Sequence, residues 1–157
     1  MDNLVFFKPN VTHIASMQEL VANDVENGNI LDRNSNEMAT TIRSYTAVKH
    51  DNQIVGFVAL HIHTVELAEI RSLVVKEEYR SKGIAKKLII QTLDEAKLLE
   101  LKKLLVLTYK KELFEFFGFK EIPKESIPET KIWADCIKCK HFPICDEVSL
   151  VLDINIK

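Results

Sequence analysis

The sequence lacks any apolar stretch that approaches the roughly 20 residues needed by a membrane-spanning helix. Its first ten residues, MDNLVFFKPN, also lack the basic and then apolar pattern of an export signal. Glycine and proline are scarce, with four of each in 157 residues, which excludes fibrous and low-complexity chains. These absences predict a globular protein that stays in the cytoplasm.

The chain has no large excess of charge and no even set of cysteines. Its 21 basic and 23 acidic residues give a net charge of −2, so a general attraction to nucleic acid is not expected. The three cysteines are an odd number within one short segment, which argues against a disulfide framework. We therefore expect a reducing compartment and neither nucleic acid nor membrane as a partner.

What the sequence does contain is enough apolar material, 46% of the residues, for the core of one domain over residues 1–157. Helical spacing of apolar residues predicts a helix after Asn10 or Thr12, a long helix over Gly83–Glu100 and a short one over Lys111–Phe117. Asn27–Asn36 has the composition of an irregular loop. Runs rich in β-formers predict strands at Leu4–Lys8, Ile42–Lys49, Ile54–His61, Leu67–Val75, Leu104–Thr108 and Val148–Ile154. The order indicates an α/β or α+β sheet covered by helices.

The segment Arg80–Ala85 lies between a predicted strand and the long predicted helix. The first turn of a helix has N–H groups without intrahelical partners and a positive dipole end, which suit a pyrophosphate. Gly83 would let a phosphate approach the backbone, and Arg80 and Lys82 could add positive charge. By itself the pattern favours a solvated helix start over a phosphate site, because short motifs often match by accident.

The same residues resemble the acetyl-CoA signature of the GNAT family of N-acetyltransferases, R/Q-x-x-G-x-G/A, matched by Arg80, Gly83 and Ala85. The resemblance extends over about Arg43 to Ile122 and includes the Gly-Phe pair within Phe116–Phe119. It implies a mixed, largely antiparallel sheet flanked by helices, with acetyl-CoA as co-substrate and no required metal. The cofactor-binding residues that it implies are Leu73, Val74, Val75, Arg80, Ser81, Lys82, Gly83, Ile84, Ala85, Phe114 and Phe117.

Within this family the segments Ala68–Val75, Leu107–Tyr109 and Ile132–Cys136 resemble the acetyltransferase domain of N-acetylglutamate synthases. That resemblance implies an amino acid as acceptor, L-glutamate in arginine biosynthesis, and it leaves a homodimer possible. Two alternatives stay open, namely an acetyltransferase for another small amine or a protein amine, and an acyl-CoA-binding module without chemistry.

Glu69 is the candidate general base, although it could equally form a structural ion pair with Arg71. Many relatives have a tyrosine four residues before the Gly-Phe pair to protonate the leaving thiolate, and this chain has Phe114 there. Tyr109 is the nearest alternative acid, or else a half-buried packing residue. We interpret His61 and His63 as ordinary strand residues.

An acceptor with two carboxylates favours arginine side chains, whose planar fork binds carboxylates with two hydrogen bonds. Arg43 and Arg71 are the candidates for substrate binding, and Lys131 could provide a further positive charge. The cluster Cys136, Cys139, His141 and Cys145 offers four possible zinc ligands within ten residues. We favour three reduced thiols in a loop beside the acceptor site, because zinc sites usually join two separated ligand pairs.

Overall fold

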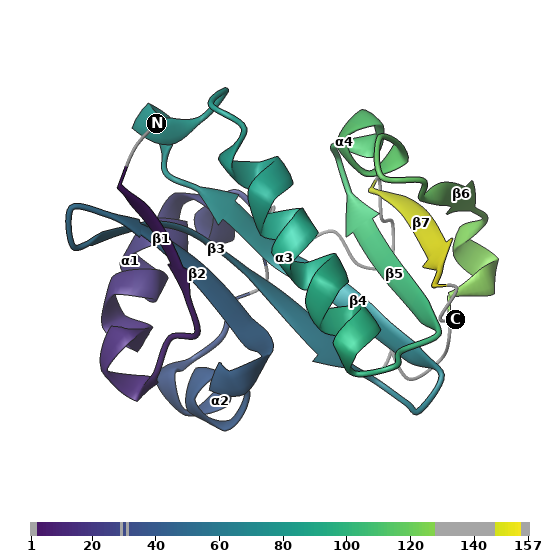
Figure 1. Cartoon of the computed structure of the whole chain (residues 1–157), viewed down its shortest axis with the longest axis horizontal. Coiled ribbons are helices and arrows are strands. Elements are labelled where there is room, and N and C mark those ends of the chain that lie inside the picture. Colours follow the sequence, from purple (N-terminus) through teal and green to yellow (C-terminus); the bar gives the residue numbers. More distant parts are fainter. Residues whose placement is uncertain (1–2, 29, 31, 128–146, 155–157) are drawn as a thin grey trace.

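The computed structural model describes residues 3–28, 30, 32–127 and 147–154 (Figure 1). They form a seven-stranded sheet in the order β1-β2-β3-β4-β5-β7-β6. Neighbouring strands are antiparallel except for the parallel pair β4 and β5. The expected mixed, largely antiparallel sheet with flanking helices is confirmed. The strands are β1 Leu4–Phe7, β2 Tyr45–His50, β3 Gln53–Ile62, β4 Leu67–Val75, β5 Lys103–Thr108, β6 Lys120–Ile122 and β7 Val148–Asp153.

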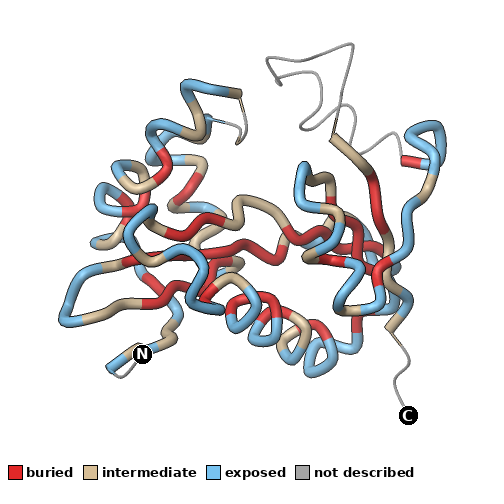
Figure 2. Tube along the Cα trace, turned by 90° about the horizontal axis from the view of Figure 1, so that it is seen from above, coloured by how far each residue is buried: buried red, intermediate tan, exposed pale blue. Residues whose placement is uncertain are grey.

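Helices cover both faces of this sheet. The long helix α3 (Ile84–Leu98) packs Leu88 and Ile89 against one face, where they join the larger core cluster. On the opposite face, α1 (Ile14–Glu26) packs Met17 and other apolar residues in a second core cluster. Two short helices, α2 (Ser35–Thr40) and α4 (Lys111–Glu115), complete the set in the described ranges, and none of these helices is long and apolar enough to cross a membrane. Figure 2 shows the buried residues following the central strands.

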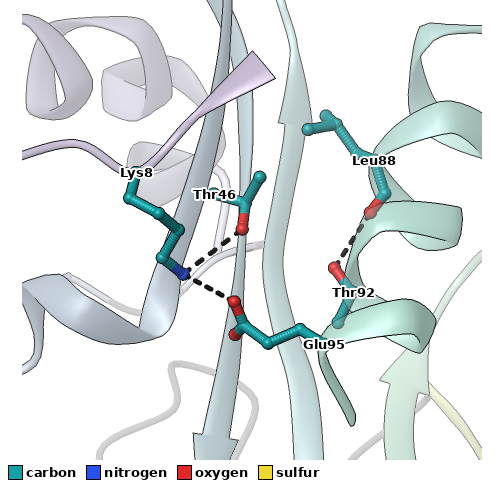
Figure 3. Close-up of polar contacts among 5 residues, drawn as sticks. All are labelled: Lys8, Thr46, Leu88, Thr92 and Glu95. Carbon is teal, nitrogen blue, oxygen red and sulfur yellow. Dashed lines mark hydrogen bonds and ion pairs between the residues drawn. The ribbon is translucent and has the colours of Figure 1, made fainter. Parts of the chain in front are cut away.

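Polar contacts also join the layers. Lys8, just after β1, donates from Nζ to Glu95 Oε2 at 2.9 Å and to Thr46 Oγ1 at 3.4 Å, so it links the sheet to α3 (Figure 3). Within α3 the buried Thr92 hydroxyl donates to the Leu88 carbonyl at 2.9 Å (Figure 3). A buried hydroxyl without a partner would be destabilising, and this bond to the preceding turn satisfies it.

Local chemistry explains where the structure departs from the expected elements. Ile42–Ser44 form a 3-10 turn, so β2 begins three residues later than predicted. The end of the expected Asn27–Asn36 loop starts α2, because the Asn34 side chain accepts from the backbone N–H of Glu37 at 2.9 Å and caps the helix. The strand β6 was not predicted. The hairpin between β2 and β3 turns at Asp51 and Asn52, which both have positive φ, as a two-residue turn requires.

The two parallel strands stay together for only part of their length. Residues Leu67–Glu69 of β4 pair with Lys103–Leu105 of β5. Beyond Glu69, β4 continues to Val75 without pairing to β5. Ser72, with φ 59°, lies in a bulge where the register between β3 and β4 shifts. A bulge bends its strand, so β4 leaves β5 and a wedge opens between them.

Candidate active site

A cleft of about 870 Å³ occupies the wedge between β4 and β5. Ile70–Val75 line one side and Val106–Lys110 the other, while the start of α3 and residues of α4 close one end. Asp24 and Ile30 contribute from the α1 side of the sheet. This volume lies in the range of small-molecule and cofactor sites, which is roughly 300–1,000 Å³.

The predicted phosphate loop lies at this cleft. After the 3-10 turn Glu77–Tyr79, the chain passes through Ser81 at φ 63° and Gly83 at φ 82°, and α3 begins at Ile84. No side chain caps this helix start, and a Cβ at Gly83 would meet nothing within 4 Å. The N–H groups of the first turn therefore face open space, which fits a bound pyrophosphate.

The loop residues differ in how they meet the cleft. Arg80, Ser81 and Gly83 line it together with Ile84 and Ala85, whereas Lys82 does not. Arg80 Nε donates to the Val75 carbonyl at 3.0 Å, so this side chain fastens the loop to the end of β4. A guanidinium carries five N–H donors, and this one bond leaves most of its donor capacity for a phosphate.

Glu69 lies where the wedge begins, as the last β4 residue paired with β5. It is only 2% exposed, and its Oε1 is 2.8 Å from His63 Nε2. Arg71, two residues further along, lines the cleft, and its Nη2 is 3.1 Å from His61 Nδ1. The two histidines are thus partners of the candidate site residues, which the interpretation of them as ordinary strand residues missed. Their spacing of two residues at the end of β3, with Glu69 and Arg71 spaced in the same way on β4, was the available signal.

The aromatic candidates are divided between the cleft and the core. Tyr109, directly after β5, lines the cleft and is 46% exposed. Phe114 also lines it, although the residue is buried and its ring packs edge-on against Phe119 with centroids 5.4 Å apart. Phe117 packs against the larger core and is not among the residues that line the cleft.

Of the predicted acceptor-binding residues, Arg71 is the one that lines the cleft. Arg43 is exposed in the 3-10 turn before β2 and does not line the cleft, and Lys131 lies outside the described residues. The sequence analysis missed Arg33, whose positive charge, with that of Arg71, acts on the phenol of Tyr45. Burial raises the pKa of Tyr45, and the charges of Arg33 and then Arg71 lower it. An arginine in an otherwise polar loop was the only signal for Arg33.

The cysteine cluster with His141 lies outside the described residues. Within the residues that the structure describes, no group of three or more His, Cys, Asp or Glu side chains could hold a metal ion.

Comparison with protein families and curated proteins gives related sequences. Residues 12–119 match the model of the acetyltransferase (GNAT) family. An uncharacterized N-acetyltransferase of Chlorobaculum tepidum is 40% identical over 126 residues, which cover 79% of each chain. An amino-acid acetyltransferase of Mycobacterium tuberculosis is 30% identical over 104 residues, which cover 64% of this chain and 59% of that protein.

Solved structures repeat the fold. N-acetylglutamate synthase from Neisseria gonorrhoeae, complexed with coenzyme A and N-acetyl-glutamate, superimposes with a TM-score of 0.83 at 19% identity. The match covers 97% of this chain and 35% of that longer one. A Mycobacterium tuberculosis protein in complex with CoA gives a TM-score of 0.83 at 21% identity, with 96% and 99% of the two chains covered.

Proposed function

This chain belongs to the GNAT family of acetyltransferases, and from that premise we propose that it transfers an acetyl group from acetyl-CoA to the α-amino group of L-glutamate. Family membership makes the protein an acyltransferase that uses acetyl-CoA. The choice of an acidic amino acid is the proposal. One observation carries it, namely that Arg71 lines the same cleft as the phosphate loop.

Residues of the cleft suit each part of acetyl-CoA. The pyrophosphate would lie at Gly83 and the first turn of α3, with Arg80 beside it. The pantetheine arm and the acetyl carbonyl would lie along Leu73–Val75, where β4 has left β5. Within the described residues, the backbone groups on that edge pair with no neighbouring strand, so they could hydrogen-bond the carbonyl and stabilise the negative charge that develops on its oxygen. When bound, acetyl-CoA supplies a thioester that an amine can attack.

We assign the proton transfers to Glu69 and Tyr109. The ammonium of the acceptor gives its proton to the Glu69 carboxylate, directly or through a water molecule. The free amine nitrogen then bonds to the thioester carbon, and the C–S bond breaks with its electron pair going to sulfur. The thiolate takes a proton from the Tyr109 hydroxyl at the end of β5, since Phe114 has no proton to give. The nitrogen loses its second proton as it becomes an amide, and a proton returned through solvent restores the Tyr109 hydroxyl.

The acceptor carboxylates would bind positive side chains on the α1 side of the sheet. Arg71 has the most direct position, and Arg33 lies within electrostatic reach of the same buried phenol, Tyr45. Arg43 and Lys131 stay predictions from the resemblance. The relatives described as amino-acid acetyltransferases support this class of acceptor. Acetylation of glutamate would give the protein a role in arginine biosynthesis in the cytoplasm, and a homodimer is compatible with it.

A thiol-release assay with acetyl-CoA and a panel of amines tests the proposal. The panel contains glutamate, aspartate, glutamine, other amino acids, polyamines and short peptides with free N-termini. We expect glutamate to give the highest kcat/KM. Turnover on another amine but not on glutamate would reassign the acceptor. The relative that is 40% identical is compatible with this outcome, because no acceptor amine is known for it from its name. Coenzyme A binding without turnover on any amine would instead favour a non-catalytic module.

A further inference from the structure

Four polar side chains form two pairs on one face of the β3–β4 ladder. The register places His61 opposite Glu69 and Ala59 opposite Arg71. Side chains alternate along a strand, so His61 and His63 share a face with Glu69 and Arg71. The neighbouring residues Leu60, Ala68 and Ile70 point the other way and join the core beneath α3. The four side chains therefore lie on the face where we propose that the acceptor binds.

The two pairs have opposite hydrogen-bond polarity. An ionised carboxylate can only accept, so where Glu69 is ionised the Nε2 of His63, 2.8 Å away, carries a proton and donates it. A guanidinium can only donate, so at 3.1 Å from Arg71 the Nδ1 of His61 must be the acceptor. The rings contact each other edge-on, with centroids 4.6 Å apart. The acidic and the basic side chain thus each have a histidine partner in the matching tautomer.

The Glu69–His63 pair is buried to a degree that requires an explanation. The side chains are 3% and 4% exposed respectively. A buried ion pair adds little stability compared with apolar residues of the same volume, whereas removal of one partner destabilises the fold because the other is left unpaired. Ionisable groups with a specific polar partner beside a cleft are candidates for a role in its chemistry. The pair is not itself among the residues that line the cleft, but Glu69 directly precedes Ile70 and Arg71 of the cleft wall and is the last β4 residue paired with β5.

We infer that His63 is a positioning residue that holds the Glu69 carboxylate ionised and in place, through its Nε2–H, for the proton of the acceptor ammonium. This inference rests on the proposed role of Glu69 as general base, and it does not depend on which amine is the acceptor. His61 has the parallel role of orienting Arg71 by accepting its Nη2–H. His61, His63, Glu69 and Arg71 are the ionisable side chains that β3, β4 and their connection contribute to these two pairs. From neighbouring elements, the Tyr45 phenol of β2 lies within electrostatic reach of Arg71, Arg33 and Glu37.

Two substitutions of His63 separate its hydrogen bond from its other contributions. Gln can present an N–H near the position of Nε2, whereas Leu fills a similar volume without a donor. We expect His63→Leu to lower kcat about tenfold and to move the acid limb of kcat/KM up by about one pH unit, because a carboxylate that loses a donor has a raised pKa. The KM for acetyl-CoA should not change. His63→Gln should restore most of kcat and the wild-type pH profile.

His61→Asn is the matched control. Position 61 lies two residues before His63, and an Asn side chain there can present an acceptor near the position of the His61 Nδ1. We expect it to keep the wild-type acid limb and to affect mainly the acceptor KM. A folded His63→Leu variant with the wild-type pH profile, or a His63→Gln variant as impaired as His63→Leu, would overturn the inference. Circular dichroism and coenzyme A affinity establish that each variant is folded.

A measurement on the wild-type protein covers the case in which His63→Leu does not fold. In ¹⁵N NMR, the His63 signal is assigned by its loss in His63→Gln. We expect this signal to show a slowly exchanging proton on Nε2, and we expect the proton resonance to shift upfield in Glu69→Gln. A His63 protonated only on Nδ1, or an Nε2 proton unaffected by Glu69→Gln, would overturn the inference. If glutamate is not acetylated but another amine is, the kinetics are measured with that amine. The proposed acceptor then fails, and the role of His63 is still tested.

Discussion

Three buried polar side chains in the described part of the chain, Thr46, Glu69 and Thr92, have different kinds of partner. Thr92 bonds to the preceding turn of its own helix, and Thr46 accepts from Lys8, so both contacts are explained by the fold alone. Glu69 is equally buried, yet it is ionisable and its partner His63 lies across the strand pair. A carboxylate in that setting is poorly explained by stability. Its place directly before the cleft-lining residues Ile70 and Arg71 accounts for it better.

Glu69→Gln tests the proposed base directly. Glutamine preserves the shape and can still accept from His63 through its carbonyl, so the fold should be retained. It cannot take a proton from the acceptor ammonium, and we expect kcat to fall by roughly 10² to 10⁴ with little change in the KM for acetyl-CoA. Glu66→Gln, an exposed neighbour before β4, is the control. A kcat within twofold of wild type in the Glu69 variant would exclude Glu69 as the base.

Arg71 gives the corresponding test for the acceptor. Loss of a charge-assisted bond to a carboxylate is worth about 1.5–3 kcal/mol, so Arg71→Ala should raise the acceptor KM by roughly ten- to a hundredfold. Arg71→Lys keeps the charge but loses the planar fork, and it should restore only part of the affinity. The KM for acetyl-CoA serves as the internal reference, and equal increases in both KM values would remove Arg71 from the acceptor site. The same comparison on Arg43→Ala tests the prediction made from the resemblance.

At the scale of the element, we propose that the start of α3 binds the phosphates of coenzyme A through its backbone rather than through one side chain. Gly83 has positive φ and open space around its missing Cβ, and Asn and Asp both tolerate this backbone region better than other residues. Gly83→Asn and Gly83→Asp therefore differ almost only in charge. We expect Gly83→Asp to bind acetyl-CoA on the order of tenfold more weakly than Gly83→Asn, because its carboxylate opposes both the phosphates and the helix dipole. Calorimetry on the two folded variants measures this difference, and equal affinities would refute the loop assignment.

The strand β3 carries a glycine that lies against the wall of the cleft. A Cβ at Gly56 would lie 2.9 Å from the Val74 carbonyl oxygen, a backbone atom of β4 that cannot rotate away. Gly56→Ala should therefore destabilise the protein by about 1–3 kcal/mol in urea unfolding and also weaken coenzyme A binding. Gly118→Ala is the comparison, since its Cβ would meet only a Leu152 methyl group at 3.6 Å and Gly118 is not among the residues that line the cleft. It should destabilise through its positive φ and leave coenzyme A binding unchanged.

Elements with strong periodicity could be predicted from the sequence, and those that depend on partners could not. The strand at Leu67–Val75 was predicted with its observed ends, and the long helix within two residues. β6 has only three residues and exists because it pairs with β7, which no local pattern reveals. The pairing of His63 with Glu69 is similarly a product of register between strands. The loop at Gly83 was predictable because its chemistry is contiguous in the chain.

At the scale of the whole molecule, the sheet consists of two parts that meet at the wedge. β1 to β4 form one part, and β5, β7 and β6 form the other (Figure 1). The strands that meet, β4 and β5, pair over only three residues each, and the larger core cluster beneath them joins the parts further. A ligand that fills the cleft contacts both parts at once, so its binding free energy adds to the stability of their junction.

Coenzyme A should therefore raise the free energy of unfolding of the protein and protect both walls of the cleft. At a ligand concentration of 100 Kd the gain is about 2.7 kcal/mol, which corresponds to an increase in Tm of roughly 5 to 10 °C for a chain of this length. In hydrogen exchange, protection should increase on both walls of the cleft, at Ile70–Val75 and at Val106–Thr108, while β1 at the far edge of the sheet stays unchanged. Gly83→Asp at the same coenzyme A concentration should show a smaller increase in Tm. Protection confined to one wall would mean that the ligand does not bridge the wedge, and the cleft between β4 and β5 would then not be the coenzyme A site.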